Sequence, residues 1–273
     1  MENSKWNIGV CSWSLQAGLD EVVAAMKTIG VDHVHLAVGP ALDAKEGPAY
    51  LTAVKQQNWT ISCTMIGFEQ EDYSTLDTIK VTGGVVPDEH WPGNKAIVEG
   101  AAKVTRDLGV PYLSFHAGFI DEGDPAKYKV MCERLTCLAD IAAAQGILLL
   151  METGQETAEE LAAFMKELNH PALGINYDPA NMILYAKGNP IEGLKVLAPW
   201  IKHIHIKDAI KTDTPGQWGA EVPWGQGQVP GDAFLATLTE IGYKGTLAIE
   251  REAGDDRPGD IALAAKTLRQ SMS

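Results

Sequence analysis

The sequence has little positive charge, few cysteines and no long apolar run. Its 22 Lys and Arg residues face 36 Asp and Glu residues, for a net charge of −14, and nucleic-acid binding depends on basic contacts to phosphate. The four cysteines show no CxxC spacing, which favours reduced thiols in a cytoplasmic protein. No stretch approaches the ~18 apolar residues of a membrane span, and the N-terminus has no apolar signal core. We therefore expect a cytoplasmic protein without nucleic-acid or membrane partners.

Other absences bear on domain organisation. No GxGxxG motif follows the first strand-like segment, which argues against a dinucleotide-binding fold. Linkers and low-complexity tracts are absent, so we expect a single domain over residues 1–273. That length, with 45% hydrophobic residues, is within the range of one α/β barrel. The composition leaves a homo-oligomer open.

Strand-like and helix-like segments alternate along the whole chain, a pattern typical of a parallel sheet. Helical periodicity is clear over 125–144, and Thr157 with Glu160 forms a capping-box signature for the next helix. The expected strands are Asn7–Cys11, His33–Ala37, Thr60–Met65, Tyr112–His116, Ile147–Glu152, Leu173–Tyr177, Ile201–Ile206 and Thr246–Glu250. Eight such units predict a (β/α)8 TIM barrel.

A glycine recurs between helix and strand, at Gly30, Gly109, Gly146 and Gly242. Glycine just past a helix end adopts the left-handed conformation at little cost. This repeat fits a barrel better than a doubly wound sheet. The longer connections, 66–93 and 208–230, both follow strands, which places them at the carboxyl face where active sites of barrels form.

Four residues stand at the ends of successive strand-like segments: Glu152, Asp178, His205 and Glu250. If those strands are parallel neighbours, three carboxylates and one imidazole converge on one point. The alternative is that the carboxylates are separate surface or ion-paired residues. Such oxygen-rich ligand sets suit one divalent cation, with Mn²⁺ first, and Mg²⁺, Co²⁺ or Zn²⁺ as alternatives.

The chain is similar to a known family over nearly its whole length. The similarity is most specific in four sequence motifs: METG, NYDPAN, HIHIKD and IGYKGTLAIE. They resemble the sugar isomerase and epimerase family with the xylose isomerase-like barrel, which includes ketose 3-epimerases, hydroxypyruvate isomerases and inosose dehydratases. The resemblance implies that Glu152, Asp178, His205 and Glu250 bind one divalent cation. It also implies that Glu152 and Glu250 are the catalytic acid/base pair.

The chemistry follows from these roles. Proton abstraction beside a carbonyl produces an enediolate, whose charge a cation stabilises, and two carboxylates on opposite faces allow epimerisation. We therefore expect an isomerase or epimerase of a ketose or keto-sugar, with a small-molecule carbohydrate as partner. Expulsion of a β-substituent would instead make a lyase or dehydratase acting on a keto-sugar, keto-glycoside or inosose.

Two other readings have less support. Endonuclease IV, a distant relative, needs additional histidines, and the segment 211–231 contains none. A non-catalytic sugar-binding barrel would not need all four ligands.

Substrate contacts differ from the family pattern in two places. The epimerases carry a His where this chain has Asn181, and a substrate-binding Arg where it has Lys211. We expect both residues to bind substrate. His116 ends a strand facing the pocket and is expected to donate to substrate, with a satisfied core histidine as the alternative. Lys207 either points away from the pocket or reaches a substrate oxygen.

Aromatic residues are the last candidates. Trp13 and Trp224, with Trp91 and Trp218, fall in expected carboxyl-face segments. Indole rings pack well on the apolar surface of a sugar, and we expect Trp13 and Trp224 to bind substrate; loop anchoring is the alternative. Glu252 is an alternative ligand to Glu250.

Overall fold

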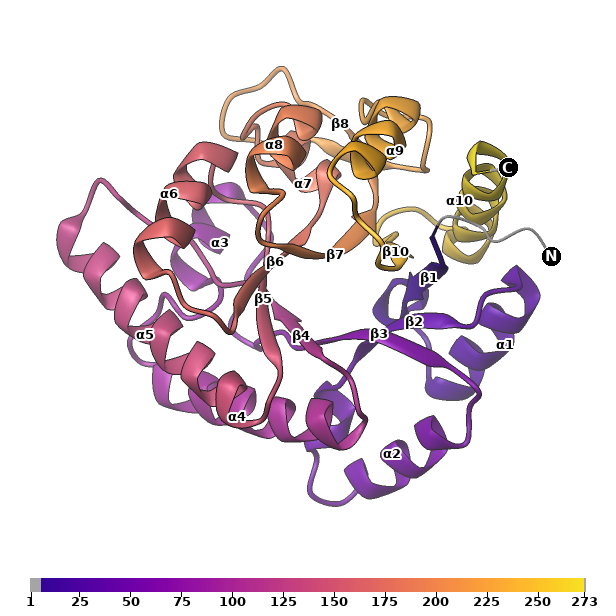
Figure 1. The fold of residues 1–273 in the computed structure, drawn as a ribbon, viewed down its shortest axis with the longest axis horizontal. Helices are drawn as coiled ribbons and strands as arrows, with labels where there is room; N and C mark the ends of the chain where they lie inside the picture. Colours follow the sequence, from indigo (N-terminus) through magenta and orange to yellow (C-terminus); the bar gives the residue numbers. More distant parts are fainter. Residues whose placement is uncertain (1–5, 273) are drawn as a thin grey trace.

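The computed structural model describes residues 6–272, and its centre is a closed barrel of eight parallel strands (Figure 1). Going round the barrel, the order is β1-β10-β7-β6-β5-β4-β3-β2. The strands are β1 (Ile8–Cys11), β2 (His33–Ala37), β3 (Thr60–Met65), β4 (Tyr112–Phe115), β5 (Leu148–Glu152), β6 (Leu173–Tyr177), β7 (Ile201–Ile206) and β10 (Leu247–Ile249). The predicted (β/α)8 TIM barrel is therefore confirmed. Some strands end one residue earlier or start one later than expected.

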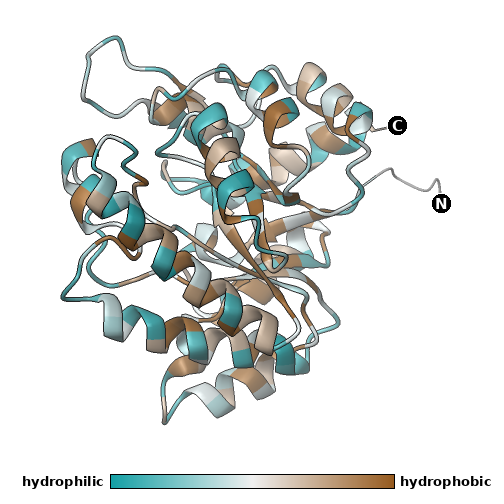
Figure 2. Cartoon of the chain, turned by 60° about the vertical axis from the view of Figure 1, so that its left-hand side comes forward, coloured by the Kyte–Doolittle hydropathy of each residue, from teal (hydrophilic) through white to brown (hydrophobic). Residues whose placement is uncertain are grey.

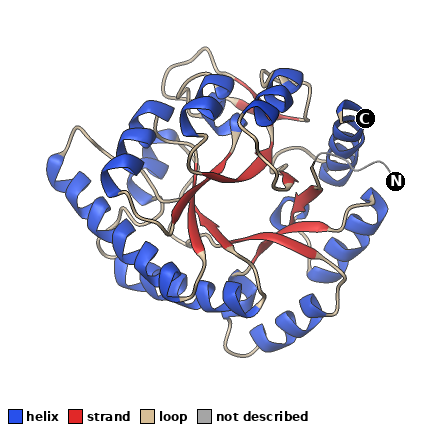
Figure 3. Ribbon diagram, in the orientation of Figure 1, coloured by secondary structure: helices blue, strands red, loops and turns tan. Residues whose placement is uncertain are grey.

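Helices surround the strands on the outside (Figure 3). The helices are α1 (Leu19–Ile29), α2 (Gly47–Lys55), α3 (Leu76–Thr82), α4 (Trp91–Asp107), α5 (Pro125–Ala144), α6 (Ala158–Leu168), α7 (Pro179–Leu184), α8 (Pro190–Leu197), α9 (Gly231–Glu240) and α10 (Arg257–Ser271), with 3-10 turns η1 (Ser12–Leu15) and η2 (Gly39–Leu42). Hydrophobic residues lie on the strands and on the inner faces of these helices (Figure 2). Burial of both faces of the sheet explains why the strands read as apolar runs.

The predicted helix boundaries have the expected local causes. Gly30, Gly109, Gly146 and Gly242 all have left-handed backbone, with φ between 72° and 74°. The capping box at Thr157 is present, because its hydroxyl accepts the Glu160 N–H and the Glu160 carboxylate accepts the Thr157 N–H. These contacts satisfy N–H groups that a helix start leaves free.

Two long connections lie at the carboxyl face of the barrel. The segment after β7 contains a two-stranded antiparallel sheet, β8 (Asp208–Ile210) and β9 (Ala220–Val222). The Asp208 carboxylate organises the rest of this segment by accepting the N–H groups of Gly225, Gly227 and Val229. The two connections meet where the Trp218 indole donates to the Tyr73 carbonyl oxygen, 3.1 Å away.

Two further expectations concern the whole chain. All four cysteines are free, as expected. Within residues 6–272, no helix combines the length and the apolar character that a bilayer crossing requires.

Candidate metal centre and active site

The four predicted ligands converge at the carboxyl end of the barrel. Glu152 ends β5, Asp178 follows β6, His205 lies in β7 and Glu250 follows β10. One ligand atom from each lies within 4.8 Å of the others. The His205 Nδ1 atom is 3.4 Å from Glu152 Oε1, 3.5 Å from Asp178 Oδ2 and 3.3 Å from Glu250 Oε2. We call these four residues the ligand cluster.

The ligand cluster has the chemistry of a divalent-cation site. All four side chains are buried, and burying like-charged carboxylates together is costly without a compensating charge. Within the described chain, Asp178 Oδ2 and His205 Nδ1 are buried without any hydrogen-bond partner. Both atoms face the other ligands. A cation would give both a partner, so the residues present fit a divalent metal ion.

The surroundings favour the protonated form of two of the four ligands, His205 and Asp178. Burial alone lowers the pKa of His205, but the neighbouring Cys11, Glu250 and Glu152 raise this pKa well above its ordinary value. Burial raises the pKa of Asp178 to about 6. A cluster that holds protons so readily is one in which a metal ion would have to displace them.

Asp178 is positioned by its own helix. One oxygen, Oδ1, caps α7 by accepting the N–H groups of Ala180 and Asn181 at 2.7 and 3.0 Å. The Asp178 backbone N–H donates to Thr153 Oγ1. Because one oxygen is used for capping, the other is left pointing at His205. The DPAN phrase therefore supplies both a helix start and a ligand.

Glu250 is surrounded by donors. Trp13 Nε1 donates to its Oε1 at 2.7 Å, and Lys207 Nζ donates to its Oε2 at 2.9 Å. Burial alone raises the pKa of Glu250, but Lys207 and His205 hold it well below the ordinary value. Glu250 is therefore ionised near neutral pH.

Glu152 has weaker partners. Asn181 Nδ2 donates to its Oε1 at 3.1 Å, and His116 Nε2 lies 3.7 Å from Oε2. Burial raises the pKa of Glu152, but His116 and His205 lower it below the ordinary value. Its two histidine neighbours therefore favour a carboxylate at this position.

Lys207 points into the site. Its ammonium group lies 2.9 Å from Glu250 Oε2 and 3.0 Å from Glu252 Oε2. Glu252 is half-exposed and lies outside the ligand cluster. Glu221 is held by Arg251, which donates to its Oε1 at 2.8 Å. Asp178 Oδ2 and Glu221 Oε2 each lie 3.9 Å from the same ammonium group, so four carboxylates surround Lys207.

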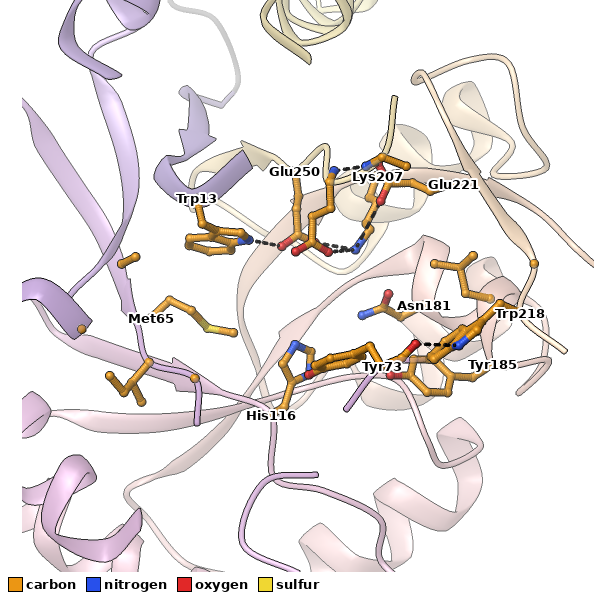
Figure 4. A pocket seen from close by; sticks show the side chains of 18 of the residues that line it. Trp13, Met65, Tyr73, His116, Asn181, Tyr185, Lys207, Trp218, Glu221 and Glu250 are labelled. Carbon is orange, nitrogen blue, oxygen red and sulfur yellow. Dashed lines mark hydrogen bonds and ion pairs between the residues drawn. The ribbon is translucent and has the colours of Figure 1, made fainter. Parts of the chain in front are cut away.

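Beside the ligand cluster lies a cavity of about 810 Å³ (Figure 4). Four of the predicted substrate-binding residues line it: Trp13, His116, Asn181 and Lys207. Sequence reasoning did not assign Tyr73, Tyr185 or Trp218 to substrate, although all three line the cavity. The sequence places Trp218 among the carboxyl-face tryptophans, for which sugar packing and loop anchoring are both open. The tyrosines follow no motif, so the sequence carried no signal for them.

The structure does not bring Lys211 and Trp224 to the cavity. Lys211 is exposed, and its backbone N–H donates to Gln228 Oε1. Trp224 is buried against Phe234, with ring centroids 6.2 Å apart, and covers Gly231. Asp208 directs the connection so that Trp218, not Trp224, faces the cavity. Trp224 thus has the loop-anchoring role that was the alternative.

A layer of polar side chains that the sequence did not assign lies beneath His205. His35, Asn176 and His203 are buried inside the barrel. His35 Nδ1 lies 3.0 Å from His205 Nε2, and the Asn176 side-chain amide lies 3.1 Å from the same nitrogen. Histidine at a barrel-interior position, where apolar residues are usual, was the available signal.

Comparison with known proteins places the chain among related barrels. The family model described as "Xylose isomerase-like TIM barrel" matches residues 23–271. A protein from Planctomyces limnophilus, solved as a xylose isomerase domain protein, is 34% identical, with a TM-score of 0.89 over 97% of each chain. A xylose isomerase-like TIM barrel protein from Mycobacterium smegmatis, solved in complex with magnesium, has the same fold: 20% identity and a TM-score of 0.74 over 98% of this chain and 96% of that one.

Curated relatives match part of their own length. The uncharacterized protein YihM of Escherichia coli is 28% identical over 55% of this chain and 46% of its own length. An inosose dehydratase of Clostridium botulinum is 26% identical over 65% of this chain and 64% of its own. The putative L-ribulose-5-phosphate 3-epimerase SgbU of E. coli is 26% identical over 57% of each chain. The chain thus spans between about half and two thirds of these relatives.

Proposed function

Because the chain belongs to the xylose isomerase-like TIM barrel family, we propose that it is a divalent-metal-dependent isomerase or epimerase of a ketose or keto-sugar. The observation that carries this proposal is the ligand cluster, in which two glutamates, an aspartate and a histidine share one buried point. Mn²⁺ is the proposed metal, since oxygen-rich sites with one imidazole suit it. When bound, the cation would stabilise the negative charge of an enediolate.

The two glutamates are the proposed acid and base. Glu152 ends β5 and Glu250 follows β10, and these strands are separated in the barrel by β6 and β7. They therefore approach the cluster from different sides. A carboxylate on each side of a substrate carbon can remove a proton from one face and return it to the other.

The remaining proposed contacts position the substrate. His116 and Asn181 line the cavity and contact Glu152, so each can donate to a substrate oxygen next to that base. Lys207 has three N–H bonds, and Glu250 and Glu252 accept two of them. The third, with Asp178 and Glu221 3.9 Å from the nitrogen, can donate to a substrate oxygen. Trp13, fixed by Glu250, offers its ring face to the sugar.

The second candidate is a lyase. Similarity to an inosose dehydratase over 65% of the chain favours it. Both reactions share the first proton abstraction. They differ in whether the next step returns the proton or expels a substituent at the β-carbon.

The test is solvent deuterium incorporation. A panel of keto-sugars is incubated with the Mn²⁺-loaded protein in deuterated water, and the label position is read by NMR. We expect label at the carbon next to the ketone, and its loss in Glu152→Gln and Glu250→Gln. Glu159→Gln, an exposed carboxylate in α6, is the control and should retain exchange. Exchange surviving in both of the first two variants would overturn the acid/base assignment. Release of water or of an alcohol from the substrate would identify a lyase.

A further inference from the structure

The cavity beside the ligand cluster is larger than a monosaccharide needs. Its volume of about 810 Å³ falls in the upper part of the ~300–1,000 Å³ range of pockets that enclose drug-sized ligands. A monosaccharide at the ligand cluster would fill only a small part of this space. The rest of the cavity has room for a second group joined to the sugar.

The walls of the cavity differ from one end to the other (Figure 4). Glu250, Lys207 and Glu221 lie together at the charged end. Away from them lies a group that we call the aromatic wall: Tyr73, Tyr185 and Trp218. Lys207 and Glu250, which are proposed to act on the sugar, belong to the first end, and the second offers mainly apolar surface.

The aromatic wall is built from three separate parts of the chain and is held in place. Trp218 donates to the Tyr73 carbonyl oxygen at 3.1 Å. The rings of Tyr185 and Trp218 are in edge-to-face contact, with centroids 4.7 Å apart. Such an arrangement presents ring surface at a low entropy cost, because the side chains are already ordered. Tyr73 is 43% exposed, so its ring is available to a ligand.

Charge argues against a phosphorylated occupant. Among the described residues that line the cavity, Lys207 is the single Lys or Arg side chain. Glu250 and Glu252 already accept hydrogen bonds from it. Three carboxylates, Glu221, Glu250 and Glu252, also line the cavity and would repel a phosphate. A neutral substituent is therefore favoured.

We infer that the substrate is a keto-sugar joined to a neutral, apolar ring substituent, with the sugar at the ligand cluster and the substituent against the aromatic wall. This inference rests on the proposed function for the sugar end alone. It assigns Tyr73, Tyr185 and Trp218 to recognition of the substituent.

Binding measurements test the inference without turnover. Calorimetry with Mn²⁺-loaded Glu152→Gln, which is expected to be inactive, compares the phenyl glycoside, the methyl glycoside and the 6-phosphate of one 3-keto-hexose. We expect the phenyl glycoside to bind at least about tenfold more tightly than the methyl glycoside, which is the scale of one well-packed aromatic contact. The 6-phosphate should bind no more tightly than the methyl glycoside.

Variants then locate the preference. Trp218→Ala, added to the same background, should remove most of the tenfold preference and leave the Kd of the methyl glycoside unchanged. Leu263→Ala, an exposed apolar position on α10, is the control and should retain the preference. Equal affinities for the phenyl and methyl glycosides, tightest binding of the phosphate, or no binding of the phenyl glycoside would overturn the inference.

Failure of the two proposals is distinguishable. If deuterium exchange fails while the phenyl preference holds, the recognition of the substituent stands and the isomerase proposal falls. If exchange occurs on free keto-sugars without any phenyl preference, the reverse holds.

Discussion

His35 Nδ1 lies 3.0 Å from His205 Nε2, on the side of the His205 ring away from the carboxylates. His35 Nε2 lies 3.2 Å from the Thr64 carbonyl oxygen, which can only accept, so this nitrogen carries the hydrogen. Burial lowers the pKa of His35 well below its ordinary value, so the ring is neutral and its Nδ1 is an acceptor. His205 Nε2 lies 3.0 Å from this acceptor and 3.1 Å from the Asn176 side-chain amide. Both partners lie inside the barrel, and His205 Nδ1 is the nitrogen left for a metal ion.

This relationship predicts that loss of His35 weakens metal binding. His35→Ala should lower the Mn²⁺ affinity by about 10–100-fold, the usual effect of removing a hydrogen-bond partner of a metal-bound histidine. Calorimetric titration of Mn²⁺ measures this change. His33→Ala is the matched control, because His33 lies in the same strand and pairs with Asp32 away from the cluster. Equal Mn²⁺ affinities of the two variants would contradict the prediction.

Asp178 has two functions that substitution can separate. Asp178→Asn keeps an oxygen that can cap α7 but loses the ligand charge. We expect its melting temperature without metal to equal or exceed that of the parent, since a buried carboxylate is costly. Its Mn²⁺ affinity should fall by more than the ~10–100-fold expected for an indirect partner.

Asp178→Ala is the companion variant. It also loses the cap, which should cost about 1 kcal/mol of unfolding free energy. Metal titration and thermal melts with and without Mn²⁺ distinguish the two effects. A parent-like rise in melting temperature with Mn²⁺ in Asp178→Asn would remove Asp178 from the ligand cluster.

The barrel and the ligand cluster were predictable because both depend on short-range sequence rules. The alternation of strands and helices predicts a parallel sheet, and glycine at positions such as Gly146 ends the helices. Parallel strands must align their carboxyl ends, so side chains at the ends of neighbouring strands, such as Glu152 and Asp178, are brought together by topology alone.

The residues that line the cavity were less predictable, because the loops that connect strands to helices have no hydrophobic periodicity. Trp218 and Trp224 lie six residues apart in one Gly-rich segment, and the sequence alone did not indicate which would face the cavity. The choice depends on Asp208, whose carboxylate holds Gly225 and Gly227. Lys211, in the same connection, is exposed. His35 was also unassigned, because its role depends on a contact with a residue 170 positions away.

Glu156 lies outside the ligand cluster. Its burial predicts that the stability of the fold depends on pH. It is buried, its Oε1 accepts the Ile120 N–H at 2.8 Å, and burial raises its pKa to about 7. The folded state therefore keeps a proton that the unfolded chain loses from about pH 4.5 upward. The contribution of this proton to the free energy of unfolding is fully present below that pH. It falls as the pH rises and is lost above about pH 7.

Glu156→Gln should abolish this dependence. We expect a gain in unfolding free energy of up to about 3 kcal/mol at pH 8 and little change at pH 4.5, measured by urea denaturation at both pH values. Glu159→Gln, an exposed neighbour in α6, should change neither value. An equal effect of Glu156→Gln at the two pH values would show that burial of the charge is not the cause.

The ion pairs of Lys207 predict that metal binding and the stability of the fold are coupled. Its ammonium is the nearest positive group to Glu250 and Glu252. Burial lowers the pKa of Lys207, but the surrounding carboxylates, Glu250 and Glu252 foremost, together raise it well above its ordinary value. Lys207→Gln leaves those carboxylates without that charge. We expect it to lose about 3 kcal/mol of unfolding free energy without metal, as in other broken buried pairs.

Mn²⁺ should restore part of this loss, because a cation at the ligand cluster compensates the same carboxylates. The rise in melting temperature on adding Mn²⁺ should therefore be larger in Lys207→Gln than in the parent, and the Mn²⁺ affinity should increase. Lys211→Gln, an exposed lysine outside the cavity, should show the parent's rise. If Lys207→Gln also showed the parent's rise, the ammonium would not compete with a cation for Glu250, and the electrostatic coupling argued from their 2.9 Å contact would be wrong.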